Sequence, residues 1–139
     1  MIAKKRHGVA TVIRVVRLGT SRASAEGPRL GTVRRPPRGV PKARFARDDW
    51  YDAWLPDLAP SEALVKQGLR AQSSQAWEAF AKKYRREMSA PDKARLLDLL
   101  ALLSQTTNFS VGCYCEDESR CHRSVLQKLL AERGALLAA

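Results

Sequence analysis

FSVGCYCEDESRCHRSVLQKLL, the segment from Phe109 to Leu130, contains a strand pattern followed by a helix pattern. Apolar and small polar residues alternate over 109–115, so an extended strand would place every second side chain on one face. After a charged break, apolar residues recur at three- and four-residue spacing from His122 onward, which is typical of an amphipathic helix. The segment therefore predicts a strand, a polar loop and a helix, and loops of this kind carry the chemistry of many α/β domains.

Most of the chemically versatile side chains of the chain lie in that predicted loop and at the start of the predicted helix. The candidate ligand-binding residues of this segment are Cys113, Cys115, Cys121, His122 and Arg123. They include every cysteine of the chain and one of its two histidines.

The remaining elements are predicted from the same periodicities. They are strands over 11–18 and 30–33, and helices over 61–69, from 73 or 74 onward, and from about 91 to 104. Strands separated by helices predict an α/β fold: a single small domain with a parallel or mixed sheet of few strands, covered by helices in Rossmann-like layering. We assign 11–139 to this domain and 1–10 to a basic N-terminal tail.

A second candidate loop follows the strand predicted over 30–33. Its sequence is RRPPRGVP, and its candidate ligand-binding residues are Arg34, Arg35 and Arg38. Three prolines stiffen this loop, and a guanidinium held on a stiff backbone loses less entropy when it binds a carboxylate or a phosphate. The alternative, a basic surface loop without a ligand, stays open.

The net charge of +11 is concentrated near the N-terminus. Residues 1–47 contain thirteen lysines and arginines, with Glu26 as the one acid. Such a block indicates either an anionic partner, including weak and non-specific contact with nucleic acid, or a solvated basic face. Since no apolar run is long enough to span a bilayer and no secretory signal is evident, we expect a cytoplasmic protein without membrane contact. The oligomeric state is not indicated.

The cysteine pattern favours neither a disulfide framework nor a metal knuckle. The count is odd, and Cys113 and Cys115 lie too far apart on one strand to pair. Cys121 and His122 are adjacent, so bringing both to one tetrahedral zinc ion is expected to strain the loop. Nor do the arginines fit the spacing of a phosphatase-type thiol nucleophile, and the neighbouring acids would raise a thiol pKa. We expect no structural disulfide, no metal and no cofactor.

Two interpretations of the segment stay open. In the first, Arg38 and Arg123 face each other across one pocket with His122 on its rim, and bind a small phosphate- or carboxylate-bearing ligand. In the second, Cys113 and Cys115 are small core residues and Arg123 pairs with a structural carboxylate such as Asp49 or Asp57. Whether the domain is an enzyme is left undecided by the sequence.

Several segments resemble the bacterial domain-of-unknown-function family 488 (DUF488). They are RRPPRG at 34–39, WLPDLAPS at 54–61, the aromatic helix around Trp77 to Glu87, and the terminal strand and helix with its Cys-His-Arg. The resemblance extends over roughly Thr11 to Ala131 and implies a shared fold. It implies no activity, because the family has no established one, and the strand before the arginine loop lacks the acid and the Trp usual there.

Overall fold

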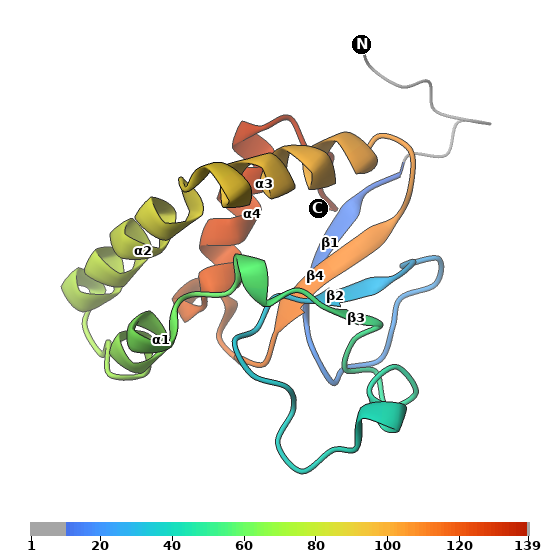
Figure 1. Ribbon diagram of the computed structural model, residues 1–139, viewed down its shortest axis with the longest axis horizontal. Coiled ribbons are helices and arrows are strands. Elements are labelled where there is room, and N and C mark those ends of the chain that lie inside the picture. The colour runs from blue at the N-terminus through green and yellow to red at the C-terminus, as the bar shows by residue number, and fades with distance from the viewer. Residues whose placement is uncertain (1–10, 139) are drawn as a thin grey trace.

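The computed structural model describes residues 11–138, apart from the side chain of Glu118. Four parallel strands form one sheet in the order β1-β4-β2-β3 (Figure 1). Their bounds are Ile13–Arg17 for β1, Arg29–Gly31 for β2, Ala53–Trp54 for β3 and Phe109–Cys113 for β4. The predicted small α/β domain with a parallel sheet is confirmed. The predicted basic tail, 1–10, lies outside the described residues.

The central strand β4 sets the register of the sheet. Val111 lies opposite Val15 of β1 and opposite Leu30 of β2. All five residues of β4 are buried, as expected for a strand with a neighbour on each side. The predicted strand over 109–115 was too long, because the chain leaves the sheet after Cys113.

The edge strand β3 was not predicted. Its two residues pair with Leu30 and Gly31 of β2, and a strand this short cannot show an alternating pattern. Trp54 is exposed, but its indole Nε1 donates a hydrogen bond to the Val33 carbonyl at 2.7 Å. The β3 segment therefore ties down the start of the arginine loop.

Four α-helices follow the expected pattern. Their bounds are Glu62–Leu69 for α1, Ser74–Met88 for α2, Pro91–Leu103 for α3 and His122–Glu132 for α4. Ser61 and Ser73 cap α1 and α2, since each side-chain oxygen accepts a hydrogen bond from a backbone N–H three residues later. Pro91 occupies the first turn of α3, where its missing N–H costs no hydrogen bond. Short 3-10 turns lie at Lys42–Arg44, Pro56–Leu58 and Glu118–Arg120.

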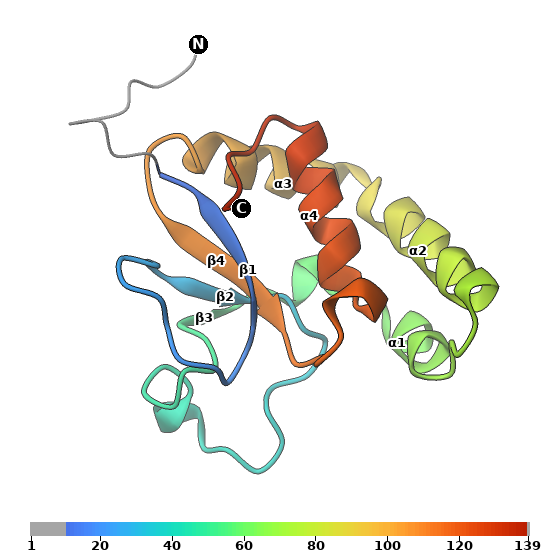
Figure 2. The same ribbon diagram turned by 180° about the vertical axis from the view of Figure 1, so that it is seen from behind.

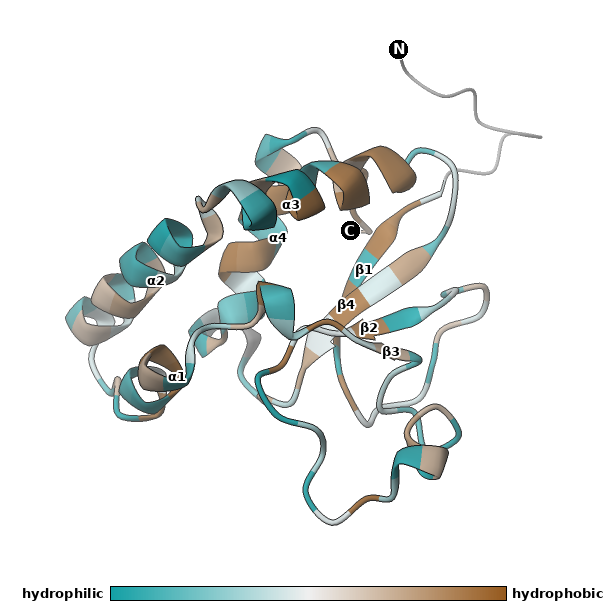
Figure 3. Ribbon diagram, viewed as in Figure 1, coloured by the Kyte–Doolittle hydropathy of each residue, from teal (hydrophilic) through white to brown (hydrophobic). Residues whose placement is uncertain are grey.

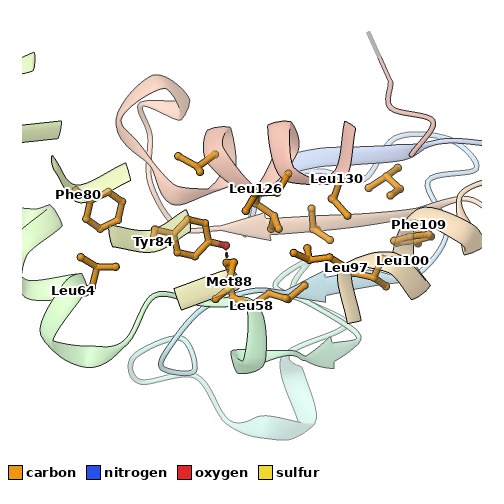
Figure 4. Packing of buried hydrophobic residues seen from close by; sticks show 14 residues of the cluster. Leu58, Leu64, Phe80, Tyr84, Met88, Leu97, Leu100, Phe109, Leu126 and Leu130 are labelled. Atoms are coloured by element: carbon orange, nitrogen blue, oxygen red, sulfur yellow. Dashed lines mark hydrogen bonds between the residues drawn. The ribbon is translucent and has the colours of Figure 1, made fainter. Parts of the chain in front are cut away.

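The helices gather on one side of the sheet and cover its apolar face (Figures 1 and 2). Figure 4 shows the side chains packed between them, including Tyr84 of α2 and Leu126 of α4. The Tyr84 hydroxyl donates a 2.7 Å hydrogen bond to the Leu58 carbonyl, so this buried polar group is satisfied. None of the helices among residues 11–138 has the length and apolar character that a membrane crossing requires.

Hydropathy changes along the helical layer (Figure 3). Much of α2 is hydrophilic, whereas the C-terminal part of α3 is hydrophobic and carries the exposed leucines Leu99 and Leu102. Exposed leucines are common on soluble domains, so they assign no function by themselves.

The opposite face of the sheet holds a buried polar cluster. Arg29 of β2 forms an ion pair with Glu26 at 2.8 Å, and both side chains are almost fully buried. Ser110 of β4 donates a 2.7 Å hydrogen bond to the same carboxylate. Because Ser110 and Val111 are consecutive in a strand, they point to opposite faces, one polar and one apolar.

Candidate functional site

The arginine loop and the cysteine loop leave the sheet at the same edge. β2 and β4 are parallel neighbours, so the segments that follow Gly31 and Cys113 both begin at their carboxyl ends. This placement was predicted, and it is the usual position of ligand sites in open α/β sheets. The Tyr114 hydroxyl donates a 2.8 Å hydrogen bond to the Arg35 carbonyl and joins the two loops.

A small apolar cluster packs at this edge of the sheet. It consists of Leu18, Val33, Tyr51, Cys113 and Cys121. Trp50 and Tyr114 pack against the cluster and meet edge to face, with ring centroids 5.8 Å apart. Tyr51 of this cluster is buried.

Two cavities open on either side of Arg35 and Tyr114. The first, here called the thiol cavity, has a volume of about 560 Å³. Its wall comes from the start of the arginine loop, from α1 and from the cysteine loop. It is lined by Val33, Arg34, Arg35, Pro60, Glu62, Val65, Lys66, Leu69, Cys113, Tyr114, Cys115 and His122.

The second, here called the arginine cavity, has a volume of about 700 Å³. It is lined by Arg17, Leu18, Gly19, Thr20, Arg35, Pro36, Pro37, Arg38, Trp50 and Tyr114. Its charged lining side chains are all arginines, interleaved with two aromatic rings.

The three arginines of the loop have different environments. Arg34 donates hydrogen bonds to the carbonyls of Pro56, Ala59 and Pro60, so its guanidinium holds the turn before α1. Arg35 forms an exposed ion pair with Glu62 and borders both cavities. Arg38 is exposed at the arginine cavity and forms no ion pair with any described side chain.

Cys113 and Cys121 come together although they are eight residues apart. The structure joins them as a disulfide, so the expectation of three separate thiols was wrong for this pair. Cys121 is the extended N-cap residue of α4, and its side chain points back toward the end of β4. The sequence argument considered only the pair Cys113 and Cys115 and therefore missed this contact. The Cα atoms of the joined pair are 7.8 Å apart.

Cys115 has a different environment from the joined pair. It is a free, exposed thiol on the wall of the thiol cavity. Although the side chain is exposed, partial desolvation raises the pKa of its thiol and outweighs the opposing charge of Arg123. At neutral pH the protonated thiol therefore dominates, which disfavours Cys115 as an activated nucleophile.

His122 is buried at the first position of α4 and borders the thiol cavity. Its Nε2 lies 2.7 Å from the Thr32 carbonyl oxygen, which can only accept, so Nε2 carries the proton. Nδ1 is then unprotonated and lies 3.8 Å from the Cys121 sulfur. Burial lowers the pKa of the imidazole to about 4; the hydrogen bond to Thr32 opposes this shift, and the nearby charge of Arg123 adds to it.

Arg123 follows in the first turn of α4 and is 4% exposed. One terminal nitrogen donates a 2.9 Å hydrogen bond to the Cys115 carbonyl, while Nε is buried without a partner. Among the described side chains, no carboxylate pairs with it. Asp49, one of the predicted partners, instead pairs with Arg22 at 3.2 Å.

The predicted approach of Arg38 and Arg123 across one pocket was wrong. Arg38 lines the arginine cavity, whereas Arg123 lines neither cavity and lies behind the wall that Cys115 and His122 form. Both loops start at the same edge, but they diverge on the two sides of Tyr114.

Three of the lining residues that were not predicted show why sequence reasoning missed them. Arg17 ends β1, the other parallel neighbour of β4, so the rule that identified the two loops could also have found it. Trp50 was not among the candidate site residues, although it borders the arginine cavity. Lys66 reaches the thiol cavity from α1, and the docking of that helix carries no signal in the local sequence.

Comparison with known proteins identifies the family. Residues 13–134 match the sequence model of DUF488-N3a, which is described as the "Active DUF488-N3 subclade". No curated protein and no solved structure gave a match. Since the match covers most of the chain, including both loops and α4, this protein belongs to the DUF488-N3a subclade of the DUF488 family.

Proposed function

We propose that this domain binds a small anionic molecule, bearing a phosphate or a carboxylate, at the carboxyl edge of its sheet. The ligand lies in the thiol cavity, between the start of the arginine loop and the Cys-His-Arg start of α4. A volume of about 560 Å³ suits a small metabolite.

The observation that carries the proposal is the state of Arg123. Arg123 is 4% exposed, its Nε is buried without a partner, and no carboxylate among the described side chains pairs with it, so within the described part of the chain its positive charge is uncompensated. Buried charges are ordinarily paired, because removal from water is costly. An anion in the thiol cavity would offset this charge across the wall that Cys115 and His122 form, and the positive end of the helix dipole adds to the attraction.

The cavity lining supports the same ligand class. Arg34, Arg35 and Lys66 border it, against Glu62 as the acid on its wall. The ion pair between Arg35 and Glu62 is exposed, and exposed pairs contribute little stability, so an incoming anion can replace it at small cost. Val65 and Leu69 form an apolar part of the wall. The ligand therefore combines an anionic group with an apolar portion.

The test is anion binding to the full chain, measured by titration calorimetry and thermal unfolding with inorganic phosphate, pyrophosphate and citrate. We expect at least one of them to bind and to raise the unfolding temperature. Arg35→Met should weaken that binding about tenfold, the effect of losing roughly one charge-assisted hydrogen bond. Arg86→Met, an exposed residue on α2 away from both cavities, is the matched control and should bind normally. No binding by any of the three anions, or equal weakening in both variants, would contradict the proposal.

The arginine cavity favours a second candidate, contact with nucleic acid. Arg17, Arg35 and Arg38 surround it, and Trp50 and Tyr114 offer aromatic surface on which bases can stack. Three arginines of the basic N-terminal third therefore line one cavity. Binding of a mixed-sequence single strand, followed by fluorescence anisotropy at increasing salt, separates the two candidates. A steep loss of affinity with salt, lessened in Arg38→Met, would favour nucleic acid.

A further inference from the structure

Three side chains that can bind a metal lie together at the wall of the thiol cavity. Cys113 ends β4, Cys121 is the N-cap of α4 and His122 is its first residue. Their potential ligand atoms all lie within 4.8 Å of one another, and all three residues are buried. Sulfur and imidazole nitrogen are the ligand types that zinc prefers in proteins.

We propose that the reduced protein binds one zinc ion through the sulfurs of Cys113 and Cys121 and Nδ1 of His122. Both thiols lose their protons to solvent on binding, so two thiolates balance the charge of Zn²⁺. This inference goes beyond the proposed function, and zinc binding does not require the anionic ligand.

The local backbone removes the objection raised by the adjacency of Cys121 and His122. Cys121 is extended, with φ −126° and ψ 147°, whereas His122 is already helical. This change of direction lets two neighbouring side chains point to one place. Their ligand atoms are 3.8 Å apart, close to the separation of two ligands on one tetrahedral ion.

The histidine is already prepared as a ligand. Its Nε2–H is held by the Thr32 carbonyl at 2.7 Å, which fixes the ring and leaves the lone pair of Nδ1 toward the Cys121 sulfur. A backbone carbonyl on the second ring nitrogen is a common outer partner of metal-bound histidines. Thr32 is itself fixed, since its hydroxyl donates to the Gly112 carbonyl at 2.9 Å.

The backbone separation of the cysteines favours a shared ion in the reduced state. Their Cα atoms are 7.8 Å apart. Disulfides usually join Cα atoms about 4.4–6.8 Å apart, so a relaxed disulfide needs the two backbones to move closer. A zinc ion needs only that the two sulfurs separate, each to about 2.3 Å from the metal. Rotation of the two side chains is a smaller change than movement of β4 against α4.

The site has the form of an accessible zinc centre. Three protein ligands leave the fourth tetrahedral position to a water molecule or a bound anion. Cys113 and His122 border the thiol cavity, so that fourth ligand would come from the cavity. Cys115 lies on the same wall but outside the cluster, which makes it a matched control.

The test begins with the full chain reduced and desalted without oxygen, with three free thiols confirmed by thiol titration. Titration with Co²⁺ should give one-to-one binding, with thiolate-to-cobalt charge transfer and the visible absorption of tetrahedral cobalt. Zinc should displace the cobalt stoichiometrically. Cys121→Ser and His122→Gln should each weaken zinc binding at least tenfold, whereas Cys115→Ser should bind as the unchanged protein does.

A second measurement on the unchanged protein avoids dependence on variant folding. Zinc should protect two thiols from alkylation, and peptide mass spectrometry should identify them as Cys113 and Cys121, with Cys115 modified. The proposal is overturned if the reduced protein binds no metal, if Cys115→Ser abolishes binding, or if zinc leaves Cys113 and Cys121 open to alkylation. It is also overturned if the Cys113–Cys121 disulfide re-forms in the presence of zinc and the metal is released.

Discussion

Arg29 and Arg123 are both almost fully buried, yet their surroundings differ. Arg29, 1% exposed, donates two hydrogen bonds to the Glu26 carboxylate and two more to the carbonyls of Thr20 and Asp49. Arg123 donates one hydrogen bond, to a carbonyl, and has no carboxylate beside it among the described side chains. The first arginine is complete within the fold, and the second is not.

This difference separates a structural role from a binding role. A buried guanidinium whose three nitrogens all have partners holds elements together; here it joins β2 to the loops around Thr20 and Asp49. A buried guanidinium without a paired carboxylate is costly to keep, and an anion in the adjacent cavity that offsets its charge would explain why the residue is there. We therefore expect substitutions at the two arginines to change different properties.

The largest effect is expected for Arg29→Met. Methionine keeps much of the side-chain volume but leaves Glu26 buried without its cation. Removing one partner of a buried ion pair costs about 3–5 kcal/mol. Urea unfolding should show this loss of stability, with anion binding by the folded fraction unchanged. A loss below about 1 kcal/mol, the range of exposed pairs, would show that the cluster is not structural.

Acid should weaken the same cluster. Desolvation favours the protonated form of Glu26, but hydrogen bonds from Arg29 and Ser110 prevail and lower its pKa to about 2. Because the folded pKa lies below the unfolded one, the contribution is complete above about pH 4.5 and is lost as the pH falls through 2. That contribution amounts to about 3 kcal/mol. Unfolding free energies measured from pH 6 to pH 2 should fall accordingly, and Glu26→Gln should flatten this part of the curve. A curve unchanged by Glu26→Gln would refute the assignment.

A smaller effect is expected for Ser110→Ala. The hydroxyl donates to the Glu26 carboxylate, and hydrogen bonds to charged groups contribute about 1.5–3 kcal/mol. Ser124→Ala, next to Arg123 in α4, is the control, because the Ser124 hydroxyl donates to the uncharged Cys121 carbonyl at 2.8 Å. That substitution should cost about 1 kcal/mol. Equal losses of unfolding free energy for the two substitutions, measured by urea unfolding, would contradict a special contribution of the charged Glu26 partner.

Much of the fold could be predicted because its elements carry strong local patterns. The alternation before Cys113 identified β4, and the three- and four-residue spacing of apolar residues after His122 identified α4. β3 could not be predicted, since two residues contain no period. The partners of Glu26 and Arg29 were also missed, because Ser110 is distant in sequence and approaches only through sheet pairing.

The common edge of the two loops could be predicted, but their geometry could not. Parallel strand order brings the two loops to one edge, and residue patterns were sufficient for that step. The direction of Arg38 and of Arg123 depends on where Tyr114 divides the edge, which is a tertiary property. The meeting of Cys113 and Cys121 likewise depends on how the intervening loop closes on α4.

The smallest change in stability is expected for Arg123→Met. Its stability in the presence and absence of inorganic phosphate is also the most direct test. Without phosphate the variant loses one hydrogen bond but also an uncompensated buried charge, so its stability should stay within about 1 kcal/mol of the unchanged protein. At phosphate tenfold above its dissociation constant, the unchanged protein should gain about 1.4 kcal/mol. The account predicts that Arg123→Met reduces this gain while Arg86→Met retains it. A variant as unstable as Arg29→Met, or one that phosphate stabilises fully, would contradict the role of Arg123 in binding an anion.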